Sequence, residues 1–195
     1  PELAENVNYK ATLNLAHRCL QEGVPRLVFS SSCSVYGDAC EEAVTETSSL
    51  RPVSLYAKLK RRTEEALLAL SGGRLCVTIL RMATLFGVSP RMRFDLAINL
   101  MTLHAFKRKR ITVLGGGRQR RPFLHVSDAA AAYRTCLEVP DRLVRSQIFN
   151  VGHPESNIRI VDLAKLVAEH HPQTVIDIAP SDEEIKSYHV KFDKI

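Results

Sequence analysis

Two short stretches of the sequence carry the side chains best suited to chemistry. FSSSCSVYGD, residues 29–38, places Ser30–Ser32 at the end of an apolar run, and YAKLK, residues 56–60, places Tyr56 and Lys60 four positions apart. Residues four apart share one face of a helix. A nearby ammonium group lowers the pKa of a tyrosine from about 10, which favours acid–base catalysis near neutral pH. A proton-transfer site fits these stretches, and so does a serine-rich loop followed by an ordinary helix.

The elements that would position these residues follow from the spacing of apolar side chains. Helices are predicted over residues 4–22, 55–71, 94–107, 128–138 and 160–170, and strands over 26–30, 75–81, 111–114, 122–126, 147–151 and 174–178. Strands that alternate with helices favour an α/β fold with a mainly parallel sheet. Ligands of such sheets bind beyond the carboxyl ends of the strands, which is where the three serines fall.

Composition narrows the class of protein. The chain has 195 residues, of which 45% are hydrophobic, so one or two domains fit its length. No apolar run approaches the roughly eighteen residues of a membrane span, and nothing resembles a signal peptide. The 5 cysteines are scattered without a CxxC pair, which suits neither a disulfide framework nor a zinc site. We therefore expect a cytoplasmic protein with no metal site and no membrane partner.

The net charge of +6 comes largely from two basic runs, KRKR at 107–110 and RQRR at 118–121. Such runs usually form a solvated face, and they also suit an anionic small molecule. Stacking aromatic residues do not interleave with the charge, so we expect no nucleic-acid partner.

A dinucleotide-binding fold opens with a strand, a glycine-rich turn and a helix whose N-terminus holds the pyrophosphate. In this sequence only Gly115–Gly117 comes near that pattern, late in the chain and without the G-x-G-x-x-G spacing. The sequence also begins within a helix-like pattern and stops abruptly after KFDKI, residues 191–195. We therefore expect the chain to be the middle and later part of a longer protein.

VFSSSCSVYG followed at this distance by YAKLK closely resembles the extended short-chain dehydrogenase/reductase family, in particular its nucleotide-sugar epimerases. Further segments resemble landmarks of that family in the same order: ENVNYKATLNL (5–15), LRMATLFG (80–87), RRPFLHVSDAAAA (120–132), IFNVG (148–152) and SYHVKFDKI (187–195). The resemblance implies the later part of a Rossmann-type doubly wound parallel sheet with a small C-terminal substrate-binding α/β portion. Residues 1–85 would belong to the dinucleotide-binding domain. Residues 86–195 would mainly form the substrate-binding domain, with some strands returning to the Rossmann sheet.

The resemblance also implies roles for individual residues. Ser32 would hold the substrate oxygen, Tyr56 would be the acid/base, and Lys60 would lower its pKa and hold the nicotinamide ribose. The implied cofactor contacts are Asn6, Ser30, Ser31, Tyr56, Lys60 and Met82, and the implied substrate contacts are Ser32, Thr84, Asn99, Arg121 and Tyr188. The implied cofactor is NAD. NADP stays open, because the residue that separates the two lies about twenty positions after the glycine motif, outside this chain.

For several other polar residues, a structural role is the better interpretation than a catalytic one. Tyr36 could be a second acid/base, although packing is the better interpretation, and His125, in an apolar strand, is expected to be structural. Asp128 is expected to be the N-cap of the helix that follows it. Cys33 could be a reactive thiol, although a small packing residue is the safer interpretation.

Departures from the family patterns bear on the reaction. Nucleotide-sugar 4,6-dehydratases carry an Asp-Glu pair where this chain has Cys33 and Ser34, which disfavours dehydration. Thr84 stands where UDP-galactose 4-epimerases usually have an asparagine, and SPRMRFDL, residues 89–96, differs from their loop. Galactose epimerisation specifically is therefore in doubt.

The resulting hypothesis is an NAD(P)-dependent epimerase of a nucleotide sugar, with proton transfer by Tyr56 and transient hydride transfer to the nicotinamide. The alternatives are a reductase of a nucleotide keto-sugar or small ketone, and a non-catalytic relative that keeps the fold. The family often forms two-fold dimers through the Tyr/Lys helix, so a homodimer is expected, and the apolar residues of 55–71 available to it are Leu55, Leu59, Ala66, Leu67 and Leu70.

Overall fold

A parallel sheet carries the serine-rich segment. The computed structural model describes residues 1–38, 43–180, 187 and 189–195. In it, β1 (Arg26–Ser32), β2 (Cys76–Met82) and β6 (Gln147–Val151) form a three-stranded sheet in the order β1-β2-β6, with both pairs parallel. The register places Ser31 opposite Arg81 and Ser32 opposite Met82. Every residue of β2 is buried, as expected for a central strand with a continuous apolar run.

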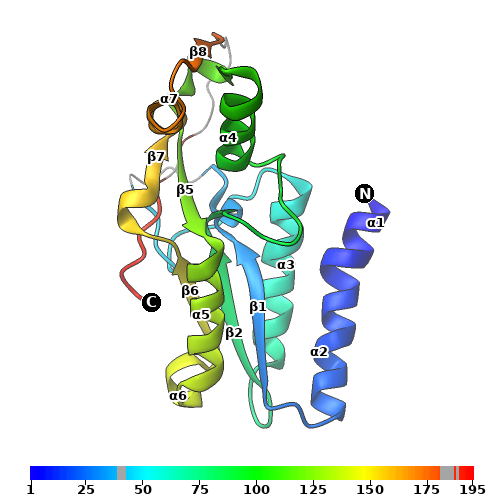
Figure 1. The fold of residues 1–195 in the computed structure, drawn as a ribbon. Helices are drawn as coiled ribbons and strands as arrows, with labels where there is room; N and C mark the ends of the chain where they lie inside the picture. The colour runs from blue at the N-terminus through cyan, green and yellow to red at the C-terminus, as the bar shows by residue number, and fades with distance from the viewer. Residues whose placement is uncertain (39–42, 181–186, 188) are drawn as a thin grey trace.

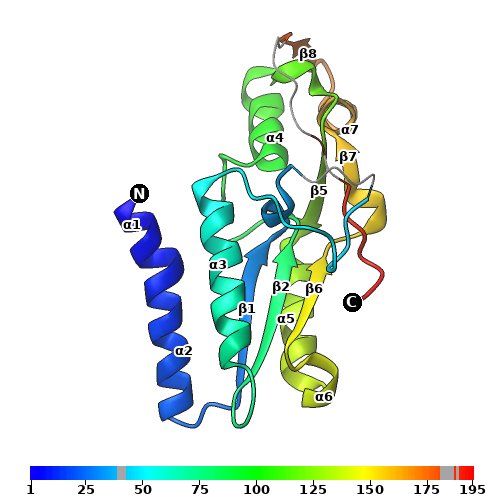
Figure 2. The same ribbon diagram turned by 180° about the vertical axis from the view of Figure 1, so that it is seen from behind.

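Helices cover both faces of this sheet (Figures 1 and 2). One face packs against α3 (Leu55–Leu70), and the other against α5 (Val126–Glu138) and α6 (Asp141–Val144). The N-terminal helix runs through α1 (Glu2–Glu5), a π-helical segment (Asn6–Lys10) and α2 (Ala11–Gln21), and it packs beside α3. A mainly parallel sheet covered on two faces confirms the predicted α/β class.

A second group of elements lies beyond the carboxyl ends of β1 and β2 (Figure 1). It contains two small sheets and two helices that pack on each other, α4 and α7. In one sheet β3 pairs in parallel with β5, which pairs antiparallel with β7; in the other, β4 and β8 are parallel. The bounds are β3 (Thr84–Phe86), α4 (Ala97–Arg108), β4 (Arg110–Val113), β5 (Arg120–His125), β7 (Asn157–Arg159), α7 (Ile160–Glu169) and β8 (Val175–Ile178).

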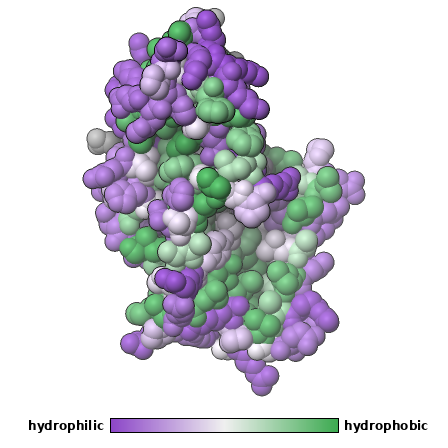
Figure 3. Space-filling model, viewed as in Figure 1, coloured by the Kyte–Doolittle hydropathy of each residue, from purple (hydrophilic) through white to green (hydrophobic). Residues whose placement is uncertain are grey.

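Three clusters of buried apolar side chains hold these layers together. One lies between β2, β6 and α5, a second between β1, α2 and α3, and a third among α4, β4 and α7. The surface of the upper group is mostly hydrophilic, whereas apolar atoms gather over the lower part of the face seen in Figure 3. The three-stranded sheet therefore has a core of its own, separate from that of the upper group.

Three predicted helix starts differ from the structure by two or three residues, and the first of these helices begins at Glu2 instead of residue 4. The helix predicted from residue 94 begins at Ala97, because Arg93 and Asp95 pair with each other and Leu96 is extended. The helix predicted from 128 begins at Val126, and its N-cap is His125, whose ring accepts a hydrogen bond from the Ser127 amide. Asp128 is therefore not the cap but a residue of the first turn. A carboxylate there interacts favourably with the helix dipole.

Candidate functional site

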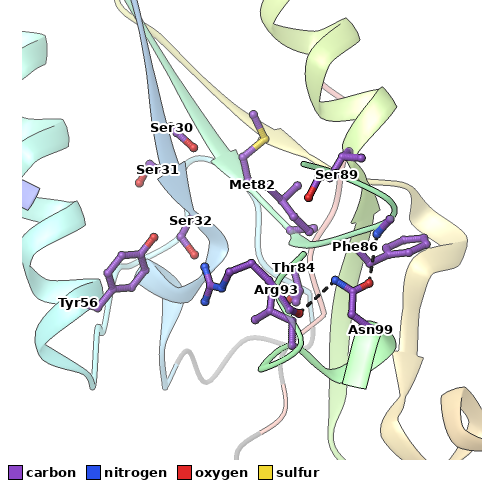
Figure 4. Close-up of a pocket in the computed structure, with 15 residues that line it drawn as sticks. Ser30, Ser31, Ser32, Tyr56, Met82, Thr84, Phe86, Ser89, Arg93 and Asn99 are labelled. Atoms are coloured by element: carbon purple, nitrogen blue, oxygen red, sulfur yellow. Dashed lines mark hydrogen bonds between the residues drawn. The ribbon is translucent and has the colours of Figure 1, made fainter. Parts of the chain in front are cut away.

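A cavity of about 510 Å³ lies at the carboxyl ends of β1 and β2 (Figure 4). Its walls come from the end of β1, the first turn of α3, the segment from Met82 to Gly87 and the start of α4. Most of the residues predicted for a site line it: Ser30, Ser31, Ser32, Tyr56, Met82, Thr84 and Asn99. The fold thus brings together residues that lie far apart in the sequence, as the family resemblance implied.

The Tyr/Lys pair lies on the side of α3 that faces β1. Ser54 caps the helix by accepting a hydrogen bond from the Ala57 amide at 3.1 Å, which fixes the first turn that carries Tyr56. Lys60 Nζ donates to the Ser30 carbonyl at 2.8 Å and lies 5.5 Å from the centroid of the Tyr56 ring. The tyrosine, the ammonium group and the serine strand therefore meet at one edge of the cavity.

Burial and a neighbouring charge act on the pKa of Tyr56 in opposite directions. Burial raises the pKa of Tyr56, and the guanidinium of Arg93 opposes this rise, while Tyr133 adds to it. The lowering of that pKa by Lys60 stays a prediction. The pKa of Lys60 is itself lowered by burial, and the carboxylate of Glu64 acts in the opposite direction.

Arg93 was not predicted as a site residue. It lies in the loop between β3 and α4, lines the cavity and extends its guanidinium towards Tyr56 and Ser32 (Figure 4). Asp95 holds it through two bonds, from Nε at 2.8 Å and from Nη2 at 2.7 Å. The signal in the sequence was a basic residue in the Pro-containing loop after a buried strand, a position that faces the ligand side of such sheets.

Asn99 binds the two ends of the loop that carries Arg93. Its Oδ1 accepts from the Gly87 amide at 3.3 Å, and its Nδ2 donates to the Arg93 carbonyl at 3.2 Å (Figure 4). The side chain is buried within the cavity wall. Both ends of the amide are therefore engaged by the loop in this structure, whereas the sequence predicted a contact with a substrate diphosphate.

The three serines have different surroundings. Ser32 Oγ accepts from the Ser34 amide at 3.2 Å and caps the 3₁₀ helix Cys33–Tyr36. Ser31 is buried, and its hydroxyl donates to the carboxylate of Glu64. Ser30 is exposed to the cavity, and its side chain forms a hydrogen bond with Tyr133 of α5. Ser30 and Ser32 are thus better placed than Ser31 to meet a ligand.

Lys60, Asn6 and Arg121 are predicted site residues that do not themselves line the cavity; Lys60 lies beside it, bonded to the Ser30 carbonyl. Asn6 lies in the π-helical segment, and Arg121 lies in β5, where its Nη1 donates to the Arg120 carbonyl at 2.8 Å. Neither of them lines the cavity wall that the structure describes. Tyr188 lies outside the described residues.

The packing interpretations of Tyr36 and Cys33 agree with the geometry. Tyr36 is fully buried; its hydroxyl donates to Asn150 Oδ1 at 2.6 Å and accepts from Arg81 at 3.0 Å. Cys33 is also buried, its thiol donates to the Arg81 carbonyl, and burial raises its pKa well above the usual range. A thiol held in this way stays protonated and packs as a small side chain.

The described part of the chain offers neither a metal cluster nor a membrane-spanning helix. Among residues 1–38, 43–180, 187 and 189–195, no group of three or more His, Cys, Asp or Glu side chains could hold a metal ion. Within the same ranges, every helix is too short or too polar to cross a bilayer.

The chain is similar to a known protein family and to curated proteins of that family. The family model described as NAD dependent epimerase/dehydratase family matches residues 1–152. The uncharacterized UDP-glucose epimerase YtcB of Bacillus subtilis (strain 168) is 30% identical over 168 residues, which cover 80% of this chain and 49% of that protein. UDP-glucuronic acid decarboxylase 4 of Arabidopsis thaliana is 28% identical over 186 residues, which cover 91% and 40%. The chain therefore spans about half the length, or less, of these curated relatives.

Solved structures share the fold. MoeE5 in complex with UDP-glucose and NAD is 28% identical with a TM-score of 0.84, and the match covers 96% of this chain and 62% of that chain. UDP-glucose 4-epimerase from Thermotoga maritima has the same TM-score of 0.84 at 22% identity, covering 98% and 62%. The second likeness shows the fold alone, and together they confirm the Rossmann-type α/β architecture predicted from the sequence.

Proposed function

The chain belongs to the NAD dependent epimerase/dehydratase family, and we propose that it epimerises a nucleotide sugar with NAD as cofactor. The observation that carries the proposal is the meeting of Tyr56, Lys60 and Ser32 at the carboxyl end of β1, at one edge of a cavity. The family model covers this whole constellation. The relatives named as epimerases, and the complex that holds both UDP-glucose and NAD, support the same substrate class.

The residues at the cavity fit a nicotinamide nucleoside. Lys60 can donate to ribose hydroxyls from its place beside the Ser30 carbonyl, and Ser30 and Met82 line the adjoining wall. NAD would supply, when bound, the acceptor and donor of hydride that epimerisation through a keto sugar needs. The protein's own task is then to orient the sugar and to move a proton.

Tyr56 is the group we assign to that proton transfer. Its phenolate would take the proton of a sugar hydroxyl and return it after the sugar has turned, while the Ser32 hydroxyl holds the same oxygen. Arg93 would hold an anionic part of the substrate, because a guanidinium suits a diphosphate or a carboxylate. The three side chains approach the cavity from different elements, which suits a ligand lying between them.

Particular residues bear on two other reactions that the family carries out, dehydration and decarboxylation. Dehydration is disfavoured, because the buried Cys33 and the neighbouring Ser34 supply no carboxylate pair. Decarboxylation of a uronic nucleotide sugar is the second candidate, favoured by the guanidinium of Arg93 and by the similarity to UDP-glucuronic acid decarboxylases. A reductase would differ from both in its net consumption of reduced nicotinamide.

The test uses UDP-glucose and UDP-glucuronic acid with NAD. Epimerisation gives a product of unchanged mass and no net change in nicotinamide absorbance, whereas decarboxylation releases carbon dioxide. We expect Tyr56→Phe to lower kcat by about 10²–10⁴-fold and to leave substrate binding intact, because only the proton-transfer group is lost. Tyr9→Phe is the control, since Tyr9 stacks on Arg62 outside the cavity. Turnover retained in Tyr56→Phe would reject the assigned mechanism.

We also infer a homodimer formed through the outer side of α3. Leu55 is 47% exposed there and is available for such a contact. Leu59 and Leu67, which the sequence offered for the same face, are buried within the fold and are not available. A light-scattering mass equal to one chain would contradict the dimer.

A further inference from the structure

A buried carboxylate lies directly beneath the candidate site. Glu64 of α3 is 2% exposed, and both of its oxygens are bound. Oε1 accepts from the Ser31 hydroxyl and from Arg81 Nε at 3.1 Å, and Oε2 accepts from Arg81 Nη2 at 2.7 Å. Arg81 is equally buried, so the two form an ion pair shielded from water. Burial of an unpaired charge costs free energy. Here both oxygens of the Glu64 carboxylate have hydrogen-bond partners.

The register of the sheet explains how this pair is built. Ser31 of β1 and Arg81 of β2 are direct partners in the parallel pairing, so their side chains point to the same face of the sheet. That face is the one covered by α3, and Glu64 meets both side chains there. The carboxylate therefore joins two strands and one helix at a single point.

The same helix binds β1 a second time, one turn earlier. Lys60 Nζ donates to the carbonyl of Ser30, and Glu64, four residues later, binds the hydroxyl of the next residue, Ser31. Two side chains on one face of α3 thus bind consecutive residues of β1. Their common effect is to set the position of the strand end, which continues into Ser32, relative to the helix turn that carries Tyr56.

We propose that Glu64 is a positioning residue for the Ser32/Tyr56/Lys60 site, acting through Ser31 on the strand end and through its charge on Lys60. The inference rests on the proposed function for its catalytic consequence. A buried ion pair is weak as a source of stability, since apolar residues of similar volume often replace one without loss. The ion pair lies next to the groups proposed to react, so it can fix their positions. A displacement of about 1 Å in such groups costs about 10²-fold in rate.

The charges around Lys60 are consistent with this role. Burial lowers the pKa of Lys60, and the Glu64 carboxylate on the same helix acts against that change. From β1, the ammonium faces the Ser30 carbonyl and, at 4.6 Å, the ring of Phe29. From β2, Arg81 faces the carboxylate, and from the β3–α4 loop Arg93 acts on Tyr56. Removal of the Glu64 charge should therefore ease the loss of the Lys60 proton.

The test compares two variants with one control in the full-length protein. Glu64→Gln removes the charge but leaves Arg81 buried and unpaired, so it could fail to fold. The double variant Glu64→Met with Arg81→Met removes the pair together and keeps an apolar filling. Thr63→Val is the control, because Thr63 is a buried neighbour on α3 whose hydroxyl binds the carbonyls of Asn8 and Leu59, away from β1.

Two measurements are made on each variant. Competitive acetylation followed by mass spectrometry gives the pKa of Lys60 without any substrate, and steady-state kinetics with UDP-glucose and NAD give kcat and KM. Glu64→Gln, where its thermal transition shows it to be folded, should have a lower Lys60 pKa than wild type, because it removes one negative charge. The double variant removes one charge of each sign, so its readout is kinetic: judged folded in the same way, it should lose about 10–100-fold in kcat with little change in KM. Thr63→Val should match wild type in both.

The outcomes separate this inference from the proposed function. A folded double variant with wild-type kcat would show that the pair is only a packing feature, and would overturn the inference. An unchanged Lys60 pKa in a folded Glu64→Gln would overturn the effect of the Glu64 charge on Lys60 even if no turnover were observed. If wild type does not turn over any nucleotide sugar while the Lys60 pKa still falls in Glu64→Gln, the action of Glu64 on Lys60 is supported and only the proposed function is rejected.

Discussion

At the scale of single residues, Arg93 supplies the positive charge that acts on the candidate base. Burial and Tyr133 raise the pKa of Tyr56, and Arg93 opposes them from the loop between β3 and α4. Lys60, by contrast, bonds to the strand end. The lysine thus anchors the strand end beside the tyrosine, and the arginine contributes a positive charge from the other side of the cavity.

This division of roles predicts a pH effect. In Arg93→Gln the opposing charge is lost, so the pKa of Tyr56 should rise further. Because the phenolate is the base, the rising limb of kcat/KM should move to higher pH. Arg93→Lys keeps a positive charge and should leave the limb near its wild-type position. A limb that does not move in Arg93→Gln, measured with UDP-glucose, would contradict the assigned effect of Arg93 on Tyr56.

The spacing of Tyr56 and Lys60 was enough to predict that they share a face, because a helix sets that geometry locally. Glu64 and Arg81 could not be predicted as a pair. In the sequence, Glu64 lies in RRTEEALLAL among several charged residues, and Arg81 ends an apolar strand. Their meeting depends on the register of β1 on β2 and on the way α3 packs, and neither of these is local.

At the scale of elements, the loop that carries Arg93 is shaped by its first residue. Gly87 has a φ of +116°, and a Cβ there would lie 2.4 Å from Nε2 of His125, the N-cap of α5. Asn99 holds the same residue through its amide. The loop can therefore start only from a residue without a side chain.

Gly87→Ala is expected to lower both stability and activity. The backbone strain and the clash should cost about 1–3 kcal/mol of the free energy of unfolding, and Arg93 should move with the loop. Gly23→Ala is the matched control: its φ is +68°, but no atom lies within 4 Å of the added Cβ. Denaturant unfolding and kcat/KM measure the two effects. Equal losses in both variants would show that the contact with His125 is unimportant.

Most elements were predictable, and the ones missed are short. The strand 147–151 matches β6 at both ends, and the helix 55–71 matches α3 to within one residue. The short elements β3, α6 and β7 were missed, because three or four residues are too few for a period to show. The strand was predicted over 26–30, which ends at Ser30, whereas β1 continues to Ser32, so all three serines belong to the strand.

At the scale of the whole molecule, the cavity lies where two groups of elements meet. The three serines come from the sheet β1-β2-β6, and Tyr56 comes from α3. Arg93 comes from the β3–α4 loop, and Asn99 from the start of α4. The alternation of strands and helices predicted the sheet, but not the separate small sheets above it, since pairing between distant strands is not encoded in periodicity. The division into domains at residue 85 stays a prediction, although β6 does pair with β2.

The position of β1 has a consequence for handling the protein. Within the described residues β1 pairs with β2 on one side only, so the amide and carbonyl groups of its other edge can recruit a further strand (Figure 1). Expressed as these 195 residues, two copies should therefore be able to pair edge to edge through β1 as the concentration rises. Light scattering over a dilution series would detect this as a mass that increases with concentration. A mass that stays constant over the series would show that this edge is protected.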